Sequence, residues 1–126
     1  MPSNLDRFYF RDIHPDVTLG TASDRYAGWI GQIYPPGLYG DKITRRTKRV
    51  GGRRFVEEVL PVESVETYFR HFGVLELDFT FYAPLADRDG EPTRNYHVLR
   101  TYARHLRSGD RLILKVPQSV FARRLY

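Results

Sequence analysis

The sequence predicts an α/β fold in which helices alternate with parallel strands. Three strand-like segments, over 17–23, 74–84 and 111–117, are separated by two amphipathic helices over 62–73 and 95–106. Helices of about twelve residues between strands imply right-handed crossovers and therefore a parallel sheet. A chain of 126 residues has the size of one domain.

The first strand is expected over 17–23, where a short apolar run enters a glycine-containing turn. An aromatic loop follows over 28–40, with one Trp, two Tyr, two Pro and four Gly in thirteen residues. The next stretch, 41–54, has seven basic residues and one acidic residue. We expect it to be a solvated, mobile loop that turns at Gly51 and Gly52.

Both helices are predicted from apolar residues that recur every three or four positions. The stripe of the first helix is Val65, Tyr68, Phe69 and Phe72, and Gly73 ends that helix. The stripe of the second helix is Val98, Leu99, Tyr102 and Leu106.

The strand over 74–84 is predicted from strict alternation up to Pro84, and the strand over 111–117 ends at Pro117. One face of the 74–84 strand is Leu75, Leu77, Phe79 and Phe81, and the other is Glu76, Asp78, Thr80 and Tyr82. Strands of a parallel sheet covered on both sides are usually apolar throughout. A polar face therefore favours the inside of a (β/α) barrel, where the active site is built at the strand tops.

Composition excludes several classes of site and partner. The chain has no cysteine, which removes disulfides and thiolate metal sites. Its four histidines, at 14, 71, 97 and 105, share no metal-ligand spacing, so we expect no metal and no cofactor. No apolar run approaches the roughly 20 residues of a membrane span, and the N-terminus has no signal-peptide core. We expect a cytoplasmic protein without a membrane partner, whose net charge of +5 favours anionic ligands.

Three segments, GTASDRYAGWIGQIYP, LELDFTFY and LILKVP, resemble the successive signatures of the YecE-like family, domain of unknown function 72. The matching residues are Gly20, Thr21, Tyr26, Trp29, Gly31, Tyr34, Pro35, Glu76, Thr80, Phe81, Tyr82, Lys115 and Pro117. Departures from the signatures are Ser23 and Asp24 in place of Gly and Trp, Asp78 in place of Asn, and no Thr-His pair after Pro117.

The resemblance covers about residues 17–121 and implies a TIM-like barrel, with 1–126 as a single domain and a basic insertion at about 41–54. A full barrel has about 250 residues, so only three of its eight strands are expected here. Three arrangements remain open: a piece that lacks the C-terminal barrel segment, a sheet completed by homo-oligomerisation, or a stand-alone domain whose segment 6–10 covers the sheet.

The resemblance also implies an enzyme or binder of a small polar ligand, sugar-like or phosphorylated, at the C-terminal ends of the strands. The expected catalytic residues are Glu76, Lys115 and Tyr82, and the expected substrate-binding residues are Tyr26, Trp29, Tyr34 and Thr80. Two structural alternatives stay open, because Trp29 and Tyr34 suit packing as well as a pocket wall. Lys115 likewise suits a cross-strand ion pair with Glu76 or Asp78 as well as acid–base or Schiff-base chemistry.

The alternative function is a non-catalytic nucleic-acid-binding or assembly module that uses the basic stretch. Its binding residues would be Arg45, Arg46, Lys48, Arg49, Arg53 and Arg54. An exposed basic loop without a specific partner is the simpler interpretation, since 41–54 itself has none of the aromatic residues that single-strand binders use.

Overall fold

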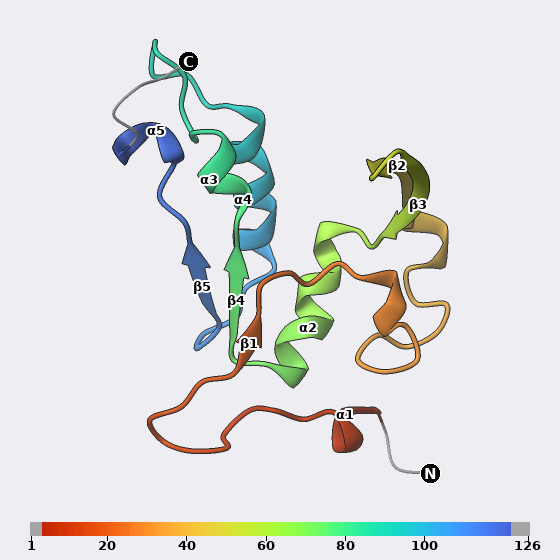
Figure 1. Ribbon diagram of the computed structural model, residues 1–126. Coiled ribbons are helices and arrows are strands. Elements are labelled where there is room, and N and C mark those ends of the chain that lie inside the picture. Colours follow the sequence, from red (N-terminus) through yellow and green to blue (C-terminus); the bar gives the residue numbers. More distant parts are fainter. Residues whose placement is uncertain (1–3, 122–126) are drawn as a thin grey trace.

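A small parallel sheet, with helices on one side and a projecting hairpin at one end, organises the molecule (Figure 1). The computed structural model describes residues 4–121. The chain is thus of mixed α/β class, with one parallel three-stranded sheet and one antiparallel two-stranded sheet. Within the described residues, every helix is too short or too polar to cross a membrane.

The regular elements follow one another in the order helix, strand, hairpin, helix, strand, two helices, strand and helix. They are α1 (Asn4–Arg7), β1 (Gly20–Thr21), β2 (Thr44–Val50), β3 (Arg53–Val59), α2 (Val65–His71), β4 (Val74–Leu77), α3 (Phe79–Tyr82), α4 (Arg94–Arg104), β5 (Arg111–Leu114) and α5 (Gln118–Phe121). Short 3-10 helices lie at Ala27–Trp29, Gly40–Lys42 and Val62–Ser64.

The parallel sheet has the order β1-β4-β5, which confirms the predicted parallel strands with helical crossovers. The helices α2 and α4 agree with the predicted helices to within a few residues. The outer strands are shorter than predicted, since β1 has two residues and β5 ends at Leu114. Leu75 and Leu77 of β4 point toward the helices and join a core that includes Tyr68, Phe69 and Tyr102.

Two residues hold the short strand β1 in place. The Tyr68 hydroxyl accepts a hydrogen bond from the Thr21 backbone N–H at 2.8 Å and donates one to the Val74 carbonyl at 2.8 Å. A single side chain of α2 therefore reaches both β1 and β4. Gly20 faces Val74 so closely that a Cβ at this position would lie 1.8 Å from the Val74 carbonyl oxygen.

The prediction of one strand over 74–84 is wrong beyond Leu77. Asp78 adopts helical dihedrals, and Phe79–Tyr82 forms the helix α3. The Asn95 side chain, in the first turn of α4, donates hydrogen bonds to the carbonyls of Phe79 and Ala83 and thereby holds both ends of α3. The polar residues of the 74–84 segment consequently do not share one strand face.

The prediction of a loop over 41–54 is also wrong, although its solvent exposure is confirmed. The segment belongs to the hairpin of β2 and β3, whose seven residue pairs run from Thr44–Val59 to Val50–Arg53. Gly51 and Gly52 form the predicted turn, both with positive φ, as the tight turns of hairpins require. The hairpin projects beyond the end of the parallel sheet (Figure 1).

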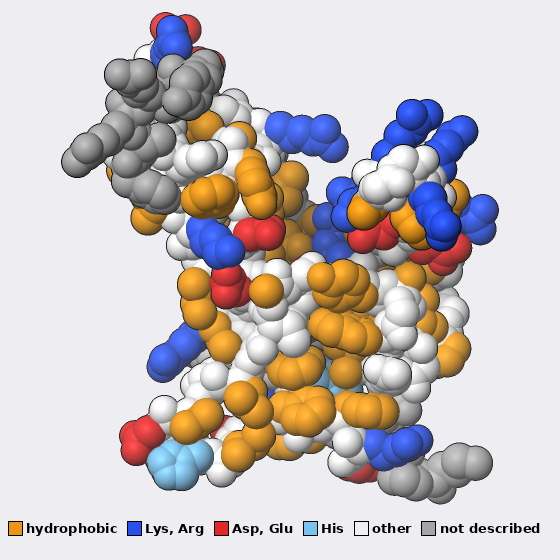
Figure 2. All heavy atoms as spheres, in the orientation of Figure 1, with side chains coloured by type: hydrophobic (Ala, Val, Ile, Leu, Met, Phe, Trp, Pro, Cys, Tyr) orange, Lys and Arg blue, Asp and Glu red, His pale blue; other side chains and the backbone are white. Residues whose placement is uncertain are grey.

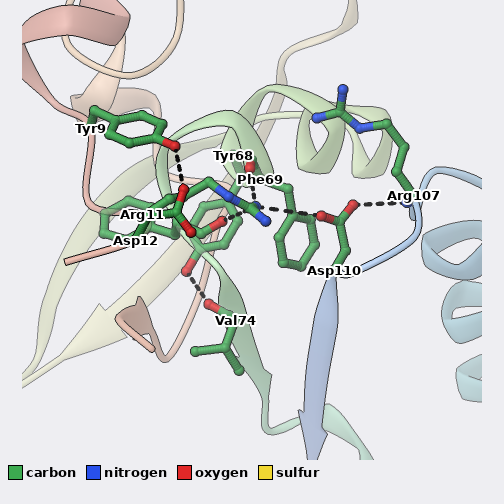
Figure 3. Close-up of polar contacts among 9 residues, drawn as sticks. Tyr9, Arg11, Asp12, Tyr68, Phe69, Val74, Arg107 and Asp110 are labelled. Carbon is green, nitrogen blue, oxygen red and sulfur yellow. Dashed lines mark hydrogen bonds and ion pairs between the residues drawn. The ribbon is translucent and has the colours of Figure 1, made fainter. Parts of the chain in front are cut away.

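The N-terminal segment packs at the lower end of α2 and does not cover the open sheet face through 6–10. The Phe10 ring stacks on Phe72 with centroids 5.1 Å apart. The Arg11 guanidinium donates to the carbonyls of Phe69 and Phe72, at 2.5 and 2.8 Å, and lies 3.5 Å from the Asp110 carboxylate just before β5 (Figure 3). Cations at a helix C-terminus satisfy carbonyls that lack partners within the helix.

Gly20→Ala is expected to lower the free energy of unfolding by about 1–3 kcal/mol, because the added methyl group overlaps backbone atoms that cannot turn aside. Urea unfolding measures the change. Gly28→Ala is the matched control, since its Cβ would meet no atom within 4 Å. Equal stability of the two variants would contradict the close approach of β1 and β4.

Candidate functional site

A cleft of about 190 Å³ opens at the C-terminal ends of β1 and β4, the edge at which parallel sheets bind ligands. The hairpin forms its opposite wall, and Figure 2 shows the notch between the hairpin and the part that carries α3 and α4. The polar side chains that line this cleft are Ser23, Asp24, Arg25, Tyr26, Arg46, Glu57, Asp78 and Tyr102.

Asp24 is the buried acidic group of the cleft. Its residue surface is only 1% exposed, and its Oδ1 accepts a hydrogen bond from the Tyr102 hydroxyl at 2.9 Å. The Tyr34 hydroxyl donates to the Asp24 backbone carbonyl. The second carboxylate oxygen, Oδ2, is buried and has no hydrogen-bond partner among the described residues. Buried polar atoms are nearly always paired, so Oδ2 is the atom of this site that still requires a hydrogen-bond donor.

Burial raises the pKa of Asp24 from 3.8 to about 6, although the Tyr102 hydrogen bond and the Arg25 charge oppose the rise. Burial also raises the pKa of Tyr34 and of Tyr102, so both phenols stay neutral near pH 7. Asp24 can therefore change its protonation state just below neutral pH. Such a carboxyl group can accept or donate a hydrogen bond to a ligand.

Two arginines add positive charge to the same cleft. Arg25 is half-buried, and its Nε donates to the Leu60 carbonyl at 2.5 Å. Arg46 comes from β2, and its guanidinium lies 3.2 Å from the Glu57 carboxylate. A guanidinium has five N–H donors, so each arginine retains donors for an anionic ligand.

The predicted catalytic residues lie on the open face of the sheet, apart from the residues that form the cleft. Lys115 Nζ is 3.1 Å from Glu76 Oε1, and both side chains are partly exposed. The hydrogen bond and charge of Glu76 raise the pKa of Lys115, which keeps the amine protonated and unsuited to attack a carbonyl carbon. Tyr82 is nearby but 75% exposed. The geometry therefore fits the structural ion pair that the sequence had left open.

The predicted substrate-binding residues are not gathered in one pocket. Tyr26 is 47% exposed, lines the cleft and contacts the half-buried Trp29, with ring centroids 5.0 Å apart. Tyr34 has no exposed surface. Thr80 is 2% exposed, and its hydroxyl donates to the Lys115 carbonyl at 2.6 Å. Only Tyr26 is thus exposed to a ligand in the cleft, while the other three pack or brace the fold.

The six basic residues of the alternative function all lie on the exposed hairpin. Glu57 pairs with both Arg46 and Lys48, and Glu58 pairs with Arg45. The other three arginines, at and beside the turn, have no acidic partner in the described part of the chain: Arg49, Arg53 and Arg54.

No family model, curated protein or solved structure in the searched collections matches the chain. Within residues 4–121, no three His, Cys, Asp or Glu side chains lie together where they could hold a metal ion. The interpretation of the cleft therefore depends on its own chemistry.

Sequence reasoning identified Asp24 only as a departure from the family signature, and it missed Arg25 and Tyr102 as site residues. The sequence indicated a core position for Tyr102, because this residue lies in the apolar stripe of α4. Its hydroxyl nevertheless reaches Asp24 across 78 residues of sequence. Local sequence patterns do not indicate a contact between residues so far apart. The sequence signal available for this site was an aspartate close to the end of a predicted strand.

Asp24→Asn is expected to change how stability depends on pH. The unfolded side chain ionises near pH 3.8, whereas the folded one keeps its proton up to about pH 6. Ionisation therefore penalises the folded state, and the free energy of unfolding falls with rising pH across about pH 4–6, by up to about 3 kcal/mol. Asparagine removes this term and keeps an acceptor for Tyr102.

Urea unfolding at several pH values, with Asp89→Asn in an exposed turn as control, measures the difference from the unsubstituted chain. Parallel stability curves for the unsubstituted protein and Asp24→Asn would show that Asp24 ionises normally in the fold.

Proposed function

We propose that the chain binds a small polar ligand, sugar-like and phosphorylated, in the cleft at the C-terminal ends of β1 and β4. The unpaired, buried Oδ2 of Asp24 carries this proposal. A hydroxyl group of the ligand would donate a hydrogen bond to this oxygen.

The two arginines support the phosphorylated character of the ligand. Arg25 comes from the loop after β1 and Arg46 from the hairpin, and both line the cleft that holds Asp24. Arginine recognises phosphate through paired N–H donors of fixed geometry. A ligand with a hydroxyl group at one end and a phosphate at the other would engage both kinds of group. Tyr26 would then contact the flat face of a sugar ring.

We also propose, on the resemblance of the three sequence segments, that the sheet is part of a YecE-like barrel. In such a barrel, the open face with Glu76, Lys115 and Tyr82 would look inward and be covered by further strands or by a second copy. Ile113 of β5 favours such a cover, because it is paired with Glu76 on this face and its apolar side chain is exposed. The absence of cysteine agrees with the proposed cytoplasmic location.

Arg46→Gln is expected to weaken binding of a sugar phosphate about tenfold or more, because a charge-assisted hydrogen bond is lost. Isothermal titration with glucose 6-phosphate and ribose 5-phosphate measures the affinity. The variant Asp24→Asn tests the proposed contact between a ligand hydroxyl group and Asp24. Arg45→Gln is the matched control, since Arg45 is adjacent but on the other face of the hairpin. Absence of binding by both sugar phosphates, or equal loss in Arg45→Gln and Arg46→Gln, would contradict the proposal. Loss only in Lys115→Ala would move the ligand to the open sheet face.

A further inference from the structure

The β2–β3 hairpin concentrates the positive charge of the molecule. Residues 44–59 have six Arg or Lys side chains and two Glu side chains, a net of +4 in a chain whose net charge is +5. Figure 2 shows the basic side chains gathered over this projecting element. Concentrated charge of this kind attracts polyanions through release of their counterions.

At the tip of the hairpin, two positively charged side chains lie opposite each other and repel. Arg49 and Arg54 are direct cross-strand partners, so their side chains leave the same face of the ribbon. Like charges at opposed positions destabilise an antiparallel pair. In the described part of the chain, no carboxylate pairs with either arginine or with Arg53 beside the turn. A bound anion would relieve this repulsion.

The other face of the hairpin exposes an aromatic ring beside the unpaired Arg53 and beside Lys48, which is paired with Glu57. Phe55 is 50% exposed and lies directly opposite Lys48. Arg53 lies two positions before Phe55 and therefore on the same face. An exposed ring flanked by cations is the arrangement on which proteins stack the unpaired bases of single strands. The sequence had not indicated this ring, because Phe55 lies one residue beyond the basic stretch.

We propose that this hairpin binds single-stranded nucleic acid, with a base stacked on Phe55 and a neighbouring phosphate held by Arg53 on the same face. The strand then passes around the tip, where Arg49 and Arg54 hold further phosphates on the opposite face. This function is separate from ligand binding in the cleft. Exposed apolar residues occur singly and on both faces, as Val56 and Phe55 do, so the hairpin has no continuous apolar face for a membrane. The exposed ring favours unpaired bases, whose faces are accessible, over a duplex.

Fluorescence anisotropy of the full chain with a labelled oligouridylate of about 12 nucleotides tests the proposal. Phe55→Ala is expected to weaken binding about fivefold or more. Val56→Ala is the matched control, because Val56 is the neighbouring residue, is 67% exposed and lies on the opposite face. Phe55→Ala should leave sugar-phosphate binding in the cleft unchanged, which separates this proposal from the preceding one.

The salt dependence tests the phosphate contacts. Combined replacement of Arg49, Arg53 and Arg54 by Gln should reduce the slope of log affinity against log salt by about 2. The control replaces three exposed arginines elsewhere, Arg88, Arg100 and Arg104, and gives the same net charge. The proposal would be overturned if the oligouridylate did not bind at low salt, or if a duplex bound equally tightly. It would also be overturned if each test variant and its control had equal effects. Binding to phosphatidylserine vesicles without binding to the oligouridylate would overturn it as well.

Discussion

The attachment of the short strand β1 to the rest of the sheet depends on one buried hydroxyl group. Tyr68 of α2 joins the backbone of β1 to that of β4, and β1 contributes only two residues to the sheet. Asp24 follows β1 by three residues, so the direction in which the chain leaves β1 determines where this carboxyl group lies. A tyrosine in an apolar helix stripe therefore positions the cleft, although it contributes no surface to it.

The helices and the parallel order of strands could be predicted because their apolar periodicity reflects burial on one side. Val65, Tyr68 and Phe69 recur at helical spacing and are buried. The same logic failed at Asp78, because the alternating pattern of 74–84 is compatible with a strand throughout. The side chain of Asn95, distant in sequence, stabilises the short helix that replaces it. Local pattern alone could not supply that information.

The hairpin was missed for a different reason. Both of its faces are solvated, so its sequence has no apolar alternation to mark strands, and only the glycine pair indicated a turn. The cleft lies at the edge of the sheet where the sequence predicted a site, but it is lined mostly by other residues. Tyr34 and Thr80 are buried, and Glu76 forms an ion pair with Lys115. Asp24 is instead the buried acidic group of the cleft. Which polar group is buried depends on tertiary packing that a single sequence does not encode locally.

The contacts of Arg11 affect the order in which the chain can assemble. Its partners Phe69, Phe72 and Asp110 lie 58, 61 and 99 residues further along the sequence. Contacts of such long separation form late, because a large loop must close first. Asp110 must therefore have joined the fold before Arg11 can make all three contacts. The segment around Arg11 is held by residues from two other parts of the described chain, so loosening either part also releases this segment.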